Sequence, residues 1–96
     1  MITTNFVPAI ESLIFAAPTP ITIADIKYCL ENTHAISIGI EEIEGCIHQI
    51  TSRYQNVAFG IELKEISGGF QFLSKPEFFP LIAEYIKVNN RKKLSR

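Results

Sequence analysis

The chain has 96 residues, with nine Lys and Arg against ten Asp and Glu, so its length and charge describe one small, nearly neutral domain. Hydrophobic residues make up 47% and charged residues 20%, a composition that predicts a folded core and excludes a disordered chain. The length also excludes a multidomain enzyme.

The charge is unevenly distributed along the chain. Residues 1–90 hold five basic and all ten acidic residues, a net charge of −5, and residues 91–96 hold the other four basic residues, a net charge of +4. An acidic body repels the phosphate backbone, whose neutralisation supplies most non-specific affinity for nucleic acids. Any nucleic-acid binding is therefore expected to depend on the tail.

The number of cysteines and the N-terminal region indicate the cellular compartment in which the protein works. Cys29 and Cys46 are too few for the disulfide framework of a small secreted domain, so a reducing cytosol is the simpler expectation. The apolar stretch at residues 13–17 follows no basic region and is far shorter than a membrane span. We therefore expect a cytoplasmic protein with no membrane association.

Apolar spacing predicts a first helix that Asn5 can cap and that ends before Pro18. Phe15 lies off its apolar face, so it must find another neighbour or be exposed. The face itself comprises Phe6, Ile10, Leu13, Ile14 and Ala17.

Two more helices follow. Thr22 and Asp25 resemble a capping box and open the second helix, which turns Ile23, Ile26 and Leu30 inward and gives way to a break at residues 32–39. The third begins at Ile40. Its predicted inward face comprises Ile40, Ile43, Cys46, Ile47, Ile50 and Tyr54.

A β-hairpin is predicted after the helices. Apolar residues alternate from Phe59, the segment 67–69 is a turn signal whose two glycines can supply positive φ, and Phe70 and Phe72 continue a second strand. Three helices followed by a hairpin form a helix-turn-helix core with a wing. The sequence therefore predicts an α+β winged helix with a fourth, C-terminal helix.

The fourth helix begins at Lys75-Pro76-Glu77, and its apolar residues sweep through about 180°, more than the roughly 100° that a helix on a small core needs. This excess suggests a second surface, from another copy of the chain or a neighbouring domain. The alternative is that most of these side chains close the core of one domain. The candidates for a dimer interface are Phe70, Phe72, Phe78, Phe79, Leu81, Ile82, Tyr85 and Ile86.

The sequence shows no catalytic or metal-binding pattern. Cys29, His34, Cys46 and His48 have separations of five, twelve and two residues, which match no zinc motif. Glu41 and Glu42 are paired acids, but they stand in the first turn of the third helix, where they stabilise the helix dipole. We expect no catalytic residue, metal or cofactor, and therefore a protein that is not an enzyme.

A winged helix often binds DNA by inserting its third helix, N-terminus first, into the major groove. In this chain Glu41, Glu42 and Glu44 stand at that end, and the wing tip carries no cation. We therefore expect no direct sequence-specific DNA binding. A winged-helix DNA-binding transcriptional regulator is the alternative function, supported by the fold and the basic tail.

Four short segments have a recognisable order along the chain: Ile10–Ala16, Pro20–Thr22, Gly68–Phe72 and Lys75–Phe78. In this order they resemble the N-terminal part of segregation and condensation protein B, the ScpB family of bacterial condensin subunits. The closing residues 94–96 resemble the start of that family's second winged helix.

The resemblance implies a tandem winged-helix protein that binds the kleisin subunit ScpA and, through it, the SMC ATPase during chromosome condensation and segregation. It also implies homodimerisation through the N-terminal domains, and kleisin binding largely through the second domain. We accordingly expect a winged-helix domain at residues 1–90 and a basic tail at residues 91–96 that starts a second domain. The protein would be cytoplasmic and associated with the nucleoid through the complex.

Overall fold

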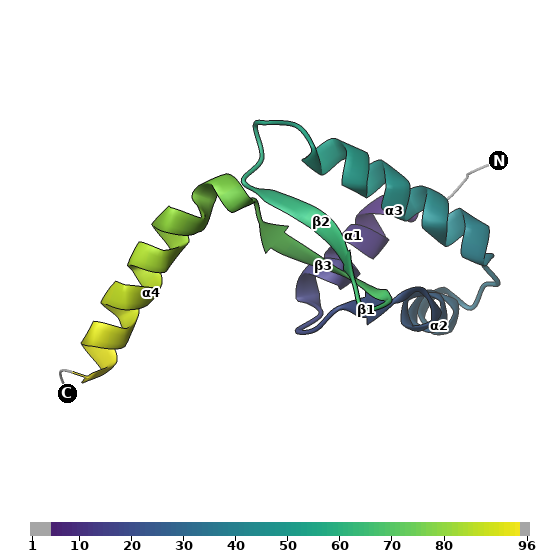
Figure 1. Ribbon diagram of the computed structural model, residues 1–96. Helices are drawn as coiled ribbons and strands as arrows, with labels where there is room; N and C mark the ends of the chain where they lie inside the picture. Colours follow the sequence, from purple (N-terminus) through teal and green to yellow (C-terminus); the bar gives the residue numbers. More distant parts are fainter. Residues whose placement is uncertain (1–4, 95–96) are drawn as a thin grey trace.

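The computed structural model describes the backbone of residues 5–94 and the side chains of residues 5–90. It shows the predicted α+β winged helix, in which three helices and a small antiparallel sheet form a body and the fourth helix extends away as an arm (Figure 1). The elements are α1 (Val7–Ala16), β1 (Ile21–Thr22), α2 (Ile23–His34), α3 (Ile40–Tyr54), β2 (Ile61–Ile66), β3 (Gly69–Ser74), a 3₁₀ turn (Pro76–Phe78) and α4 (Phe79–Leu94).

Isoleucine dominates the core between the three helices of the body. Ile10, Ile26, Ile43 and Ile50 are completely buried, and each contributes roughly 1.5–3 kcal/mol through the removal of its side chain from water. The predicted inward face of α3 is confirmed except for Ile40, which is 53% exposed. Ile40 is the first residue of α3 and lines an open pocket beside Ile23 and Tyr28 of α2.

The ends of the first two helices show how local hydrogen bonds set their bounds. Thr22 Oγ1 accepts a bond from the Asp25 N–H at 3.1 Å, as the capping pattern of the second helix predicted. The N-cap of α1 is Phe6, one residue after the predicted Asn5, whose Oδ1 accepts a bond from the Val7 N–H at 3.0 Å just before the helix. The second helix is longer than predicted. It continues to His34, and Asn32, where the break was predicted to begin, lies within it and donates its side-chain amide to the Tyr28 carbonyl at 2.8 Å.

The sheet contains one strand that the sequence pattern did not predict. Its order is β1-β3-β2, with β1 contributing only two residues, and Thr22 lies opposite Gly69. At the hairpin, positive φ occurs at Ser67 (52°) and Gly68 (83°), so the prediction that both glycines supply it is wrong for Gly69. Gly69 is needed for another reason, because a Cβ there would lie 2.8 Å from the carbonyl carbon of Pro20.

Lys75 fixes the point where the arm leaves the body. Its backbone N–H donates to the Gly60 carbonyl at 2.9 Å, and its ammonium donates to the Asn56 carbonyl at 2.7 Å. The Lys75 side chain is buried although it is charged. The loop before β2 and the start of the 3₁₀ turn are therefore held together at the base of α4.

The arm makes the molecule elongated. Its extents are 57 × 31 × 26 Å and its radius of gyration is 16.7 Å, against about 12.5 Å for a compact domain of this length. Within the described residues, none of the helices has the length and apolar character needed to cross a membrane. α4 runs through residue 90 to Leu94 without a break in the helix. Residues 95–96, part of the predicted second-domain start, lie outside the described residues, and that domain boundary stays a prediction.

Candidate functional site

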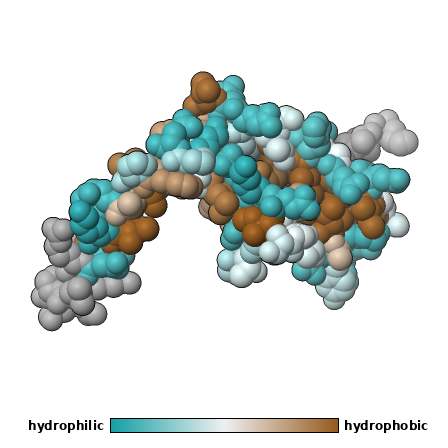
Figure 2. All heavy atoms as spheres, viewed as in Figure 1, coloured by the Kyte–Doolittle hydropathy of each residue, from teal (hydrophilic) through white to brown (hydrophobic). Residues whose placement is uncertain are grey.

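The most prominent apolar surface is on α4. All residues from Phe79 to Val88 are exposed, including Tyr85 at 66% and Leu81 at 68%. Figure 2 shows apolar atoms along the side of the arm that faces the body. At 100° per residue, five side chains fall within about 120° with Ile82 at the centre, and we call this surface the arm face. It comprises Phe79, Ile82, Tyr85 and Ile86 on α4, together with the half-buried Phe78 at the end of the 3₁₀ turn.

The structure separates the predicted interface residues into two groups. Phe79, Leu81, Ile82, Tyr85 and Ile86 are exposed on α4. The other three lie against the body: Phe70 and Phe72 pack on the core, and Phe78 is half-buried near Gly60. The ring of Phe72 also contacts that of Tyr54 edge-on, with centroids 5.0 Å apart.

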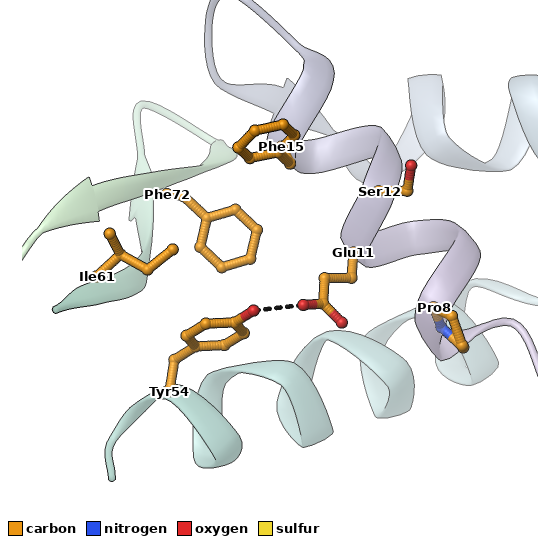
Figure 3. A pocket seen from close by; sticks show the side chains of 7 residues that line it. All are labelled: Pro8, Glu11, Ser12, Phe15, Tyr54, Ile61 and Phe72. Atoms are coloured by element: carbon orange, nitrogen blue, oxygen red, sulfur yellow. Dashed lines mark hydrogen bonds between the residues drawn. The ribbon is translucent and has the colours of Figure 1, made fainter. Parts of the chain in front are cut away.

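A second surface lies on the body, where α1, the end of α3 and the hairpin meet (Figure 3). Phe15 stands at its edge and is 76% exposed, an unusual position for a phenylalanine. The pocket has a volume of about 280 Å³, and we call it the Phe15 pocket. It is lined by Pro8, Glu11, Ser12, Phe15, Tyr54, Ile61 and Phe72.

The spacing of apolar residues does not predict the Phe15 pocket, although it contains one signal for it. Phe15 lies off the apolar face of the first helix, so the pattern gives it no neighbour there. The other aromatic residues that line the pocket, Tyr54 and Phe72, come from segments about 40 and 57 residues further along the chain. Only the packing of the hairpin against α1 brings them together.

A small polar network closes one side of the Phe15 pocket. Glu11 accepts a hydrogen bond from the Tyr54 hydroxyl, and its other oxygen accepts one from Arg53 at 3.2 Å. The hydrogen bond to Glu11 stabilises the protonated phenol and thereby raises the pKa of Tyr54. The arrangement suits the binding of an apolar side chain beside a charged rim.

The electrostatics of α3 are unfavourable for duplex DNA. Glu41, Glu42 and Glu44 are exposed in its first turns, and Arg53 stands at the opposite end. An inserted helix would bring these carboxylates against phosphates. The N-terminal end of α3, which would enter the major groove in a DNA-binding winged helix, is therefore acidic and exposed, as predicted.

The cysteines and histidines do not form a site. Cys46 is buried, and its burial raises the pKa of its thiol, with a smaller contribution from the charge of Glu42. His34 contacts the ring of Phe6 edge-on at a centroid distance of 5.5 Å. Across residues 5–90, where side chains are described, no group of three potential metal ligands gathers.

Comparison with known families decides where the chain belongs. The sequence model of the family described as segregation and condensation complex subunit ScpB matches residues 8–96. The chain belongs to the ScpB family. No curated protein matches it.

Solved structures share the fold of this ScpB-family chain. A conserved hypothetical protein from Chlorobium tepidum matches with a TM-score of 0.68 and 23% identity, covering 95% of this chain and 54% of that protein. ScpB from Mycobacterium tuberculosis matches with a TM-score of 0.77 and 14% identity, covering 93% and 54%. This chain therefore spans about half the length of these two proteins.

A third structure is similar in length as well as in fold. It is described as a dimer of the ScpB N-terminal domain complexed with ScpA peptide. It matches with a TM-score of 0.72 and 24% identity over 82% of this chain and 91% of that one. The ScpB-family chain thus has the winged-helix fold of an N-terminal ScpB domain.

Proposed function

We propose that this domain is the homodimerising part of a non-enzymatic subunit of a bacterial condensin-like SMC–kleisin complex, which acts in chromosome condensation and segregation. The observation that carries the proposal is the exposed arm face in a chain of the ScpB family. The subunit would work in the cytoplasm and associate with the nucleoid through the complex.

The physical reason for self-association is the cost of keeping the arm face in water. Phe79, Tyr85 and Ile86 are each more than half exposed on one side of a helix that packs on little of its own body. Burial of apolar surface contributes roughly 25 cal/mol per Å². A contiguous apolar surface of this kind marks an interaction site. The dimer described for the similar ScpB N-terminal domain supports a second copy as the partner.

Replacing Phe79 with Glu tests the dimer. A carboxylate at this position would be buried without a partner in the interface but solvated in the monomer, where Phe79 is 54% exposed. We expect the variant to lose the dimer in light-scattering measurements while it keeps its helical circular dichroism spectrum. Loss of the fold would instead show that Phe79 is needed for the fold of the monomer.

The kleisin ScpA, and through it SMC, is the second proposed partner. The support is family membership together with the ScpA peptide in the similar domain structure. We propose that stable kleisin binding needs the second winged-helix domain. Co-purification with the kleisin of the source organism should therefore be much stronger for a full-length protein than for this chain. Equal recovery with both would show that the second domain is not required.

A further inference from the structure

We propose that the Phe15 pocket receives the C-terminal half of α4 from a second copy of the chain, so that each arm contacts both the arm and the body of its partner. This inference rests on the proposed homodimer and specifies its geometry. It adds a surface on α1 and the hairpin that the arm face does not include.

A two-fold axis perpendicular to α4 at the arm face gives the first step. Two identical helices related by an axis in this orientation run antiparallel, and each contact occurs twice. With Ile82 at the axis, Phe79 lies opposite the partner's Tyr85, and Phe78 opposite the partner's Ile86. Apolar residues therefore meet apolar residues in this register.

The length of α4 gives the second step. In this register Val88 of one copy lies beside Pro76 at the base of the other arm. α4 continues to Leu94, and at 1.5 Å per residue the remaining helix extends about 9 Å further along the partner's body. The C-terminal end of α1, which carries Phe15, lies on the side of the body toward the arm (Figure 1). In the proposed dimer the overhanging helix would run along this side of the body and meet the Phe15 pocket.

The area of the arm face gives the third step. From their exposed fractions, its side chains offer roughly 400–500 Å² per copy, whereas a stable interface buries about 800 Å² on each partner. Arm-to-arm contact alone is therefore too small. Phe15, at 76% exposure, and the apolar lining of its pocket supply part of the missing area.

Charge complementarity gives the fourth step. Residues 1–78 hold nine acidic and four basic residues, a net charge of −5, and residues 79–96 hold one acidic and five basic residues, a net charge of +4. Arg53 neutralises part of the charge of Glu11 at the pocket, so the attraction comes from the body as a whole. A basic helix end that lies on the acidic body of a partner is favoured over one that extends into solvent.

The test compares Phe15→Glu with Tyr28→Glu. Tyr28 is a matched control because it is also an aromatic residue on a helix of the body and is 69% exposed. Sedimentation equilibrium should show at least a tenfold increase in the dimer dissociation constant for Phe15→Glu, and less than a threefold change for Tyr28→Glu. Both variants should keep the melting temperature of the parent chain at dilutions where it is monomeric.

Cross-linking adds a second readout that does not depend on affinity. In a background with Cys29→Ser and Cys46→Ala, a Phe15→Cys chain is mixed with an Asn90→Cys chain and treated with a short bis-maleimide, because Asn90 lies in the part of α4 that extends past the base of the partner's arm. We expect more covalent heterodimer than with Tyr28→Cys in place of Phe15→Cys. Equal yields, or an unchanged dissociation constant for Phe15→Glu, would overturn this inference while leaving the dimer itself intact. A parent chain that is monomeric would overturn the dimer and the inference together.

Discussion

The hydroxyl of Tyr54, at the end of α3, donates a hydrogen bond to the carboxylate of Glu11, in the middle of α1. Figure 3 shows this bond at the side of the Phe15 pocket, with Phe72 packed beside the Tyr54 ring. The pair joins two helices whose contacting residues are 43 positions apart in the sequence. It therefore holds the walls of the pocket in a fixed relation.

The first prediction concerns the pH dependence of stability. Because Glu11 raises the pKa of Tyr54 above its value in the unfolded chain, the bond contributes its full stabilisation below about pH 10. That contribution is lost as the pH rises through the raised pKa of the folded state. Chemical unfolding between pH 8 and pH 11.5 should show a steeper loss for the parent chain than for Tyr54→Phe, which has no phenol to ionise.

The same variant has an expected effect at neutral pH. Tyr54→Phe should lower the free energy of unfolding by about 1 kcal/mol, since it removes one partly buried hydrogen bond to a carboxylate. Tyr28→Phe is the control, with a change of less than about 0.5 kcal/mol expected at that exposed position. Equal effects of the two substitutions would show that the Tyr54–Glu11 bond does not join the helices.

The second prediction concerns the glycine beside β1. In Gly69→Ala the new Cβ would stand 2.8 Å from the carbonyl carbon of Pro20, so the pairing of β1 with β3 must shift. We expect a loss of about 1–3 kcal/mol in unfolding free energy. Gly45→Ala is the matched control, because its Cβ meets nothing within 4 Å on the exposed side of α3. It should stabilise the chain by about 0.5–1 kcal/mol.

The third prediction concerns the base of the arm. Lys75→Met keeps the length of the side chain but removes the ammonium that donates to the Asn56 carbonyl. We expect a loss of about 1–2 kcal/mol in urea unfolding, because a bond from a buried charged donor is removed. Lys64→Met, at a side chain 55% exposed, should change stability by less than about 0.5 kcal/mol.

The fourth prediction concerns DNA. Fluorescence titration with a duplex should show no binding at moderate salt, because the exposed end of α3 is acidic. Any binding at low salt should fall steeply with added salt, with about four released counterions, since the tail carries four cations. Binding that survives moderate salt and prefers one duplex sequence would favour the transcriptional regulator.

Local sequence patterns predict part of the fold, and the elements that they do not predict have physical causes. The three helices and the hairpin were predicted because their periodicity spans many residues, as for Ile43, Ile47 and Ile50 on α3. The strand β1 has only two residues, too few to alternate. The end of α2 was also not predictable, because Ala35 adopts a left-handed φ of 53° where a glycine or asparagine is the usual signal.

The candidate site was predictable in composition but not in arrangement. The breadth of the apolar face on the fourth helix indicated excess apolar surface. The direction of that helix depends on the buried Lys75 and the turn after it, which no periodicity encodes. For the same reason, sequence alone could not show that Phe70 and Phe72 pack inside the protomer while Phe79 and Tyr85 remain outside.

The central claim is that the exposed arm face joins two copies of this chain. Sedimentation equilibrium at micromolar concentration tests it most directly, because the monomer has a mass of 10.8 kDa and the dimer twice that. The parent chain is expected to sediment as a dimer and Ile82→Asp, at the centre of the arm face, as a folded monomer. A parent chain that sediments as a strict monomer across this range would contradict the account.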